Sequence, residues 1–325
     1  MIVAFRTVGL FAGLAACFAG CSVVGRWGGQ QPRVLVSNYA DDTVSVVDAA
    51  TDREITVIAV GDSPAGLAVR PHSSMVAVAN TTGGRVTLID ADKLAVVRTI
   101  EVTEIPEHVC FTTDGTLLFV TLPKARKLAL VDPDAGRVLE QIDLGRKPKR
   151  LAVSPDGRRL YVLLHDRPGG VAVIDIASRT VEKTIATGSF PTDFGLTRDG
   201  RRLVAASFDD DNVTVIDTES LTPIATWPVG TGLGLVVHPT KPILYSMESF
   251  DGAVHVLNFE TGEPITDLTP GEFPTYSAIT ADGRVLYIVN QDSHNVAKFD
   301  TETNERIERI AIGSEPANAV VVENW

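Results

Sequence analysis

Cysteine is scarce in this sequence, and its placement excludes several kinds of site. Of three cysteines, Cys17 and Cys21 lie near the N-terminus, and Cys110 stands alone in an apolar run. They offer no disulfide framework, no paired-cysteine metal site and no Cys-x-x-Cys-His haem-attachment motif. A nucleophile elbow and a phosphate-binding glycine loop are missing as well. We therefore predict no metal site, and we expect Cys110 to be a buried structural thiol.

Positive charge is also in short supply. The chain has 29 lysines and arginines against 41 aspartates and glutamates, so its formal net charge is −12 at pH 7. This balance disfavours a protein that coats nucleic acid or an anionic membrane, and we expect no nucleic-acid partner. Hydrophobic residues make up 44% of the 325 positions, which suits a well-buried core in one large all-β domain or two ordinary domains. We expect a monomer.

Residues 1–21 are predicted to be a lipoprotein signal peptide. One early positive charge, Arg6, precedes an apolar run that is too short to be a stable membrane span. The end of this run resembles a bacterial lipobox, in which a short triplet precedes a cysteine that is lipidated after cleavage. Cys17 has the better triplet and Cys21 the longer apolar region, so cleavage before either one fits, and simple secretion is the alternative.

The next segment, residues 22–32, contains three glycines and no apolar period, which predicts a flexible tether. Together, signal peptide and tether predict a protein of the periplasm or cell envelope that contacts a membrane only through its lipid anchor.

From residue 33 onward the chain repeats itself. An apolar strand-like run recurs seven times and ends each time in Asp or Asn, and these end residues are Asp48, Asp90, Asp132, Asp175, Asp217, Asn258 and Asp300. Successive copies lie 41 to 43 residues apart, which is typical of a propeller or a solenoid. Each copy holds four short strand-like runs and no helical period. The sequence therefore predicts an all-β, seven-bladed β-propeller over residues 33–325, with four antiparallel strands in each blade.

The same residues resemble a known family. The stretch "VSNYADDTVSVVDAATDREITVIAVGDSPAGLAV" is similar to the YVTN-repeat (YncE-like) β-propeller family, whose tetrapeptide stands here as "VLVSN", "VAVAN" and "LYIVN". The resemblance covers residues 33 to 322 and implies that the Gly-Leu-Ala-Val strand is innermost. The chain would then begin with a second strand at Arg33, and the C-terminal innermost strand would join the N-terminal strands and close the ring. The fifth copy departs from the pattern, because Gly232 stands where a proline is expected.

One position of the repeat varies in a way that points to function. Two residues after the proline that precedes each innermost strand, the family pattern prefers glycine, and Gly66 and Gly234 keep it. The other copies carry His108, Arg150, Asp193, Tyr276 and Asn318. This position should surround the mouth of the central channel, where converging polar groups form the default ligand site. The alternative is a solvated position that simply tolerates polar residues.

A run of cations adjoins this position. The segments "LPKARKL" and "GRKPKR" should share one face, so that Arg146, Lys149 and Arg150 lie together, with Arg167 of the next blade nearby. Such a localised positive field attracts anions, and arginine can hold a carboxylate or phosphate through two parallel hydrogen bonds. We expect the acidic triplet 209–211 on the far side of the mouth. A solvated rim that offsets the acidic surface is the alternative.

Two functions from different classes follow. The first is a non-enzymatic envelope lipoprotein that binds an anionic small molecule or an envelope protein partner through His108, Arg146, Lys149, Arg150, Arg167, Asp193, Tyr276 and Asn318. The second is a cofactor-handling enzyme or accessory protein, linked to a tetrapyrrole or to a quinone-dependent dehydrogenase, as the family resemblance implies. Because no catalytic motif is present, we favour the first function and predict no cofactor, although catalytic groups in propellers come from separate blades.

Lipid attachment can be tested at the two N-terminal cysteines. Replacing both, Cys17→Ser together with Cys21→Ser, should release the protein from the membrane fraction, because acyl chains contribute about 0.8 kcal/mol per buried CH₂ group. Fractionation and immunoblotting measure the shift, and the single replacements identify the acceptor. A double variant that still sediments with membranes would show that no lipid anchor is attached at these positions.

Overall fold

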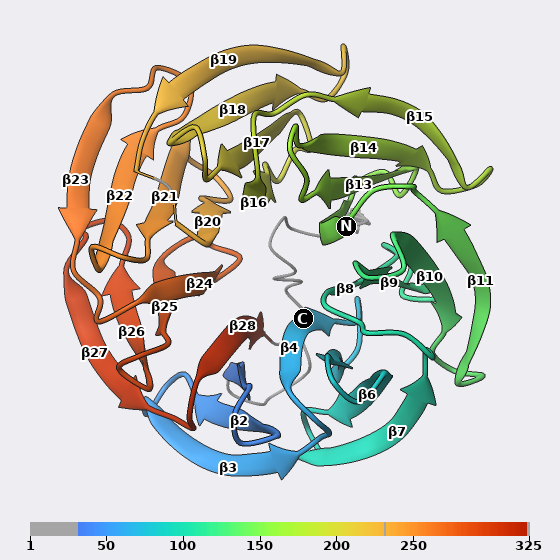
Figure 1. Ribbon diagram of the computed structural model, residues 1–325. Helices are drawn as coiled ribbons and strands as arrows, with labels where there is room; N and C mark the ends of the chain where they lie inside the picture. The colour runs from blue at the N-terminus through green and yellow to red at the C-terminus, as the bar shows by residue number, and fades with distance from the viewer. Residues whose placement is uncertain (1–31, 231, 324–325) are drawn as a thin grey trace, which may run out of the picture.

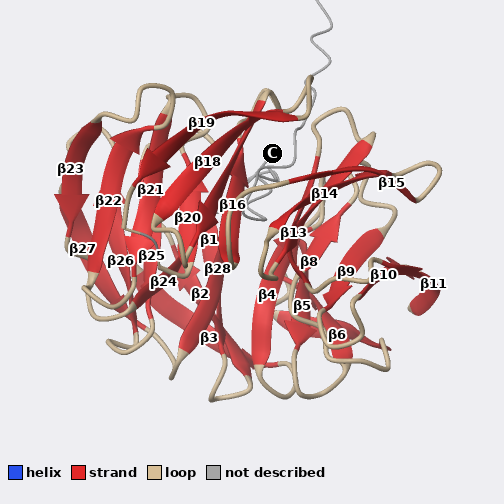
Figure 2. Ribbon diagram, turned by 45° about the horizontal axis from the view of Figure 1, so that its top comes forward, coloured by secondary structure: helices blue, strands red, loops and turns tan. Residues whose placement is uncertain are grey.

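Seven β-sheets form a closed ring around a central axis (Figure 1). The computed structural model describes residues 32–230 and 232–323, and these residues form 28 strands in seven four-stranded antiparallel sheets. No α-helix occurs among the described residues (Figure 2), so this part of the chain contains no helix that could span a membrane. The predicted seven-bladed β-propeller is confirmed.

In each blade the four strands lie in order from the axis outward. The ring closes in blade 1, whose innermost strand comes from the C-terminal end of the described residues. Blade 1 contains β28 (Pro316–Val322), β1 (Arg33–Asn38), β2 (Thr43–Asp48) and β3 (Arg53–Ala59). Blade 2 contains β4 (Pro64–Val69), β5 (Met75–Asn80), β6 (Arg85–Asp90) and β7 (Ala95–Glu101). Blade 3 contains β8 (Val109–Phe111), β9 (Leu118–Leu122), β10 (Lys127–Asp132) and β11 (Arg137–Asp143).

The remaining four blades repeat the arrangement. Blade 4 contains β12 (Pro148–Val153), β13 (Arg159–Leu164), β14 (Gly170–Asp175) and β15 (Thr180–Ile185). Blade 5 contains β16 (Pro191–Leu196), β17 (Arg202–Ser207), β18 (Asn212–Asp217) and β19 (Thr222–Pro228). Blade 6 contains β20 (Gly234–Val237), β21 (Ile243–Glu248), β22 (Ala253–Asn258) and β23 (Pro264–Leu268), and blade 7 contains β24 (Pro274–Ile279), β25 (Val285–Asn290), β26 (Asn295–Asp300) and β27 (Arg306–Ala311).

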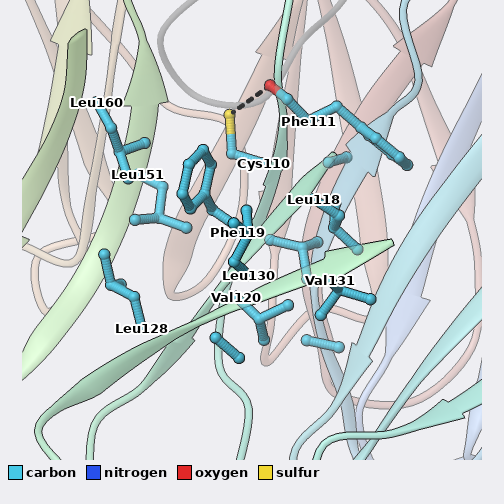
Figure 3. Close-up of a cluster of buried hydrophobic side chains, with 14 of the residues drawn as sticks. Cys110, Phe111, Leu118, Phe119, Val120, Leu128, Leu130, Val131, Leu151 and Leu160 are labelled. Carbon is cyan, nitrogen blue, oxygen red and sulfur yellow. Dashed lines mark hydrogen bonds between the residues drawn. The ribbon is translucent and has the colours of Figure 1, made fainter. Parts of the chain in front are cut away.

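Burial explains the composition of the strands. The middle strands pack against neighbouring blades on both faces, so β5 and β9 are almost wholly buried and consist mainly of Val, Ala, Leu and Phe. Outermost strands such as β7 are exposed except at one position, Ile100. Cys110 lies 4% exposed in the largest apolar cluster, beside Phe119 and Leu151 (Figure 3). It is therefore the buried thiol that the sequence predicts.

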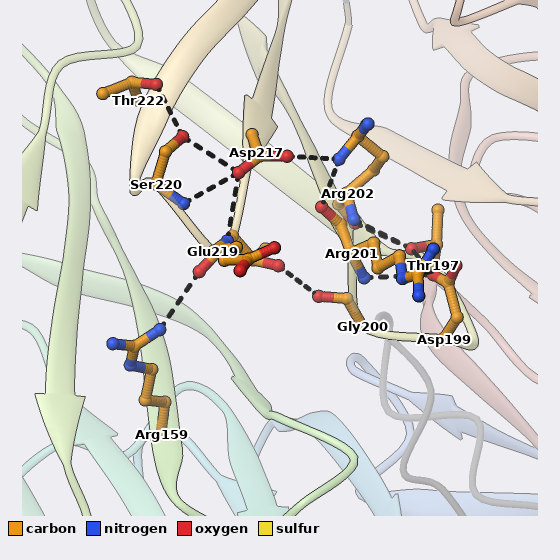
Figure 4. A network of polar contacts seen from close by, with 11 residues as sticks. Arg159, Thr197, Asp199, Gly200, Arg201, Arg202, Asp217, Glu219, Ser220 and Thr222 are labelled. Carbon is orange, nitrogen blue, oxygen red and sulfur yellow. Dashed lines mark hydrogen bonds and ion pairs between the residues drawn. The ribbon is translucent and has the colours of Figure 1, made fainter.

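The Asp or Asn that ends each third strand forms the following turn. Asp48 accepts hydrogen bonds from the backbone N–H groups of Ala50 and Thr51, both at 2.9 Å. Asp217 accepts them from Glu219 and Ser220 at 3.2 and 2.8 Å (Figure 4), and the corresponding residue of every other blade accepts at least one such bond. Only a short side chain with an acceptor oxygen can close this turn, so the residue recurs.

Close packing explains the glycine of the Gly-x-x-Pro turn in blade 2, Gly61. In blade 2 the fully buried Asn80 donates a hydrogen bond of 2.8 Å to Thr87 and so ties the second strand to the third. A Cβ atom on Gly61 would lie 3.0 Å from the Asn80 amide nitrogen, and the φ of Gly61 is +152°. Any larger residue at position 61 would displace this buried asparagine.

The C-terminal strand closes the ring as predicted. β28 pairs with β1 in antiparallel register from Arg33 opposite Val322 to Asn38 opposite Pro316. A salt bridge of 2.6 Å between Lys298 of blade 7 and Asp52 of blade 1 also joins late and early parts of the chain, across the interface between these two blades. In the fifth copy the departure at Gly232 has a structural counterpart, because β20 begins only at Gly234 and has four residues. The predicted signal peptide and nearly all of the predicted tether lie outside the described residues.

Closure gives the first structural test. Deleting residues 316–325 removes β28, including the fully buried Val320 and Val321, whose burial alone is worth about 3–6 kcal/mol, and exposes the edge of β1. The unfolding temperature should fall by roughly 10 °C or more, and the truncated protein should aggregate. Scanning calorimetry measures the shift, with deletion of residues 324–325 alone as the matched control. Equal unfolding temperatures for the two truncations would refute the closing role of β28.

Candidate binding site at the channel mouth

The five polar residues of the variable position come together at one end of the axis. We call this end the mouth face; it carries the loops before the innermost strands and the loops between the second and third strands. His108 immediately precedes β8, and the other four lie in the innermost strands of blades 4, 5, 7 and 1. Four of the five are buried; the exception, Tyr276, is half-buried, which makes the solvated alternative wrong.

Arg150 and Asp193 form a buried, bidentate salt bridge between blades 4 and 5. The Arg150 Nε lies 2.7 Å from Asp193 Oδ1 and its Nη2 lies 3.0 Å from Oδ2. The two side chains are 6% and 0% exposed. Asp193 also accepts hydrogen bonds from the backbone N–H groups of Phe194 and Leu235, at 2.8 and 3.1 Å. The carboxylate therefore joins three inner strands, because Leu235 belongs to blade 6.

This salt bridge changes the role of Arg150. The sequence predicts that its guanidinium binds an anionic ligand. Its Nε and Nη2 atoms, which could hold such an anion side by side, already pair with the Asp193 carboxylate. The guanidinium carbon lies 4.4 Å from the ring centroid of Tyr276, and Nη1 lies 3.5 Å from Nδ1 of His108. Arg150 therefore holds side chains of blades 3, 5 and 7 in place from its own position in blade 4.

His108 is a neutral imidazole in this setting. Burial, followed by the positive charges of Arg150 and Lys149, holds its pKa well below the usual 6.5. Because arginine can only donate hydrogen bonds, the contact with Nη1 requires Nδ1 of His108 to be the acceptor. The proton of the neutral ring is then on Nε2, which lies 3.9 Å from the Glu107 carboxylate.

A cavity of about 320 Å³ opens beside these residues on the mouth face. We call it the mouth cavity; its polar lining includes Thr81, Glu107, His108, Tyr276, Gln291 and Asn318, from blades 7, 1, 2 and 3. Thr81, Glu107 and Gln291 were not predicted from the sequence. Glu107 lies one residue before the variable position, at the same repeat offset as Lys149, and that offset is the signal that would have found it. Thr81 and Gln291 directly follow the second strands β5 and β25, at an offset where the sequence predicts no site residue.

Three buried polar atoms of the mouth cavity have no hydrogen-bond partner among the described residues. They are Nε2 of His108, Nδ2 of Asn318 and Oγ1 of Thr81. His108 and Asn318 are each only 4% exposed. Burying a polar group without a partner costs about 1–3 kcal/mol, so three such atoms around one cavity mark a place where a ligand can supply the missing bonds.

The outer cations are arranged differently from the prediction. Arg146 pairs with Asp166 at 3.1 Å, and Arg167 pairs with Asp209 in a bidentate contact. The acidic triplet therefore adjoins Arg167 and does not lie on the far side of the mouth. Lys149 is half-buried and close enough to lower the pKa of His165, which burial brings to about 4. The described residues contain no cluster of three or more His, Cys, Asp or Glu that could hold a metal.

Fold and site together define a seven-bladed β-propeller with a ligand-sized cavity at one end of its axis. The chain matches the family model described as YNCE-like beta-propeller over residues 9–240, and it belongs to this family. No curated protein sequence matches the chain.

Solved structures of similar fold cover most of the chain. Hydrazine synthase of Kuenenia stuttgartiensis is 20% identical with a TM-score of 0.78, and a functionally unknown protein from Desulfotomaculum acetoxidans DSM 771 is 15% identical with a TM-score of 0.77; each match covers 90% of this chain and 99% of the other. The dihydro-heme d1 dehydrogenase NirN in complex with DHE is 17% identical, with a TM-score of 0.67 and coverages of 90% and 76%. The TM-scores establish a shared fold, and at identities this low they establish nothing further.

The Arg150–Asp193 salt bridge predicts a characteristic double-mutant cycle. Arg150→Met leaves the buried Asp193 carboxylate without its cation, and Asp193→Asn leaves the guanidinium unpaired, so each should destabilise the protein by about 3–5 kcal/mol. The double variant should lose much less than the sum, because both charges are gone and the asparagine still accepts a backbone hydrogen bond. Urea unfolding measures the three values. Additive losses would mean that the pair contributes no coupling.

Proposed function

We propose that this protein is a non-enzymatic binding protein of the cell envelope that holds a small carboxylate-bearing ligand in the mouth cavity. The observation that carries the proposal is the set of buried, unsatisfied polar atoms on His108, Asn318 and Thr81. Nε2 of His108 and Nδ2 of Asn318 are donors, and the threonine hydroxyl can donate as well. Donors on residues that line one cavity suit a ligand rich in acceptor oxygens, and a carboxylate is a charged acceptor of this kind.

Two carboxyl groups, Glu107 and Glu315, line the cavity, so the support for an anionic ligand comes from the cations beside it. Lys149 and Arg150 both lower the pKa of His108, which means that they make the potential at its ring more positive. Arg150 shares its charge with Asp193, so Lys149 is the cation that remains near the cavity without a described ion pair. Asn318 lies in the innermost strand β28, and His108 and Thr81 lie next to the ends of β8 and β5, so the donors are held in position before binding and less entropy is lost when a ligand is captured.

Glu107 gives the proposal a pH dependence. Burial raises the pKa of this carboxyl group, and the side chain lines the cavity. While Glu107 is ionised it repels a bound carboxylate, and protonation removes that repulsion. Affinity should therefore increase as the pH falls from 7 towards 5. The pKa of His108 is depressed well below its usual 6.5 by burial and by the nearby cations, so this imidazole is not the source of the expected change.

A cofactor-handling role is the second candidate. NirN, a structural neighbour, was solved in complex with DHE, and an imidazole nitrogen is the kind of atom that ligates haem iron. Nε2 of His108 could do so only after giving up its proton, because Nδ1 accepts the contact from Arg150. Against this role, Arg150, which would contact a tetrapyrrole carboxylate, is engaged by Asp193. The absorbance spectrum of protein purified from its native host distinguishes the two, since a bound tetrapyrrole produces strong visible bands.

Calorimetric titration tests the proposed ligand class. Acetate, succinate and citrate, with glycerol as the neutral probe, should be titrated at pH 7 and pH 5.5. We expect a carboxylate to bind more tightly at pH 5.5, and His108→Ala and Thr81→Val each to weaken it roughly tenfold or more. Thr226→Val on the exposed outer strand β19 is the matched control and should change nothing. If no carboxylate binds, or if the two cavity variants bind as the control does, the proposal fails.

A further inference from the structure

Four phenylalanine side chains form a continuous arc on the mouth face, in loops of blades 5, 6 and 7. Phe190, Phe208, Phe250 and Phe273 follow one another with ring centroids 6.4, 6.0 and 5.6 Å apart. We call this set the phenylalanine arc. Phe250 is 67% exposed and the other three are half-buried. A contiguous row of aromatic rings that faces water marks an interaction site more often than an accident of folding.

Two members of the arc have an unfavourable backbone conformation. Phe190 has a φ of 53° and Phe273 a φ of 52°, in the left-handed region that glycine and asparagine adopt most easily. Ser63 and Glu315 have the same conformation at the equivalent positions, so the turn imposes it whatever the residue. A bulky aromatic residue there does not help folding, and its presence calls for a role at the surface.

Carboxylates surround the arc. Asp210 and Asp211 follow Phe208, Glu248 and Asp251 flank Phe250, and Glu272 precedes Phe273. None of these five forms an ion pair with another described residue. Burial and the negative charges of Asp251 and Asp211 raise the pKa of Glu248, which shows that these carboxylates repel one another. The arc is therefore an apolar surface in a negative field.

The molecule itself contains an example of what such a surface binds. The guanidinium carbon of Arg167 lies 4.1 Å from the ring centroid of Phe190, and the same guanidinium pairs with Asp209. An aromatic face and a carboxylate thus hold one arginine at the start of the arc. Phe208, Phe250 and Phe273 offer the same two groups again, and no cation is stacked on them among the described residues.

We propose that the phenylalanine arc is a docking surface for a polypeptide segment of a partner protein that carries arginine side chains separated by apolar residues. Arginine stacks on aromatic faces and pairs with carboxylates at the same time, while apolar side chains between the arginines would cover the ring edges. An anionic membrane is disfavoured as the occupant because the surrounding carboxylates would repel it. The proposal does not depend on a ligand in the mouth cavity.

Fluorescence anisotropy with synthetic peptides tests the docking surface. The probe is a fluorescein-labelled peptide of alternating arginine and leucine, compared with peptides in which lysine or glutamate replaces arginine. We expect the arginine peptide to bind, the lysine peptide to bind more weakly and the glutamate peptide not to bind. Phe250→Ala should weaken the arginine peptide about tenfold, and Asp211→Asn with Asp251→Asn should weaken it further. Ile307→Ala and Glu54→Gln, at exposed positions of outer strands, are the matched controls.

Each remaining outcome decides against the proposal. Failure of the arginine peptide to bind would mean that the arc is no docking surface for such a segment. Equal binding of the arginine and lysine peptides with no effect of Phe250→Ala would mean diffuse attraction to an acidic surface. Binding to phosphatidylglycerol vesicles that is lost in Phe250→Ala would identify a membrane as the occupant. Because Phe250 lies outside the mouth cavity, carboxylate binding in that cavity is measured separately and can fail or succeed without affecting this result.

Discussion

The antiparallel pairing of β28 with β1 is the contact on which the rest of the molecule depends. A propeller has no central hydrophobic core that could hold its blades independently of one another; each blade is buried only because it has a neighbour on both sides. The register from Arg33 opposite Val322 closes this ring, and the Lys298–Asp52 salt bridge adds a link between blades 7 and 1. Asn318, which lines the mouth cavity, belongs to the closing strand, so closure also completes the candidate site.

At the mouth face, stability and recognition draw on the same repeat position. Arg150 and Asp193 satisfy each other and the backbone of neighbouring strands, and they have little capacity left for a ligand. The His108 side chain, one blade away, accepts a contact from Arg150 at Nδ1, and its Nε2 has no hydrogen-bond partner among the described residues. The salt bridge thus joins blades 4 and 5, while blades 1, 2 and 3 retain buried polar atoms that a bound ligand could satisfy.

The fold could be predicted from the sequence because the repeat unit carries its own local chemistry. The Asp or Asn after the third strand and the glycine before the prolyl turn each perform a local task, so their spacing predicts blades directly. The ion pairs could have been predicted as well, since Arg150 and Asp193, like Arg167 and Asp209, lie one repeat apart. The contact of Arg150 with Tyr276 could not, because it joins blades that are not adjacent. The phenylalanine arc was missed because its members come from two different loops of the repeat.

The position of β28 also determines when the protein can become complete. The first strands of the propeller, β1 to β3, find their innermost partner only in residues 316–322, which are synthesised after every other strand. Blades 2 to 7 are each contiguous in sequence and can form in order, but blade 1 remains unfinished and the ring open until β28 has been made. The complete ring therefore cannot form during synthesis before this last strand has left the ribosome.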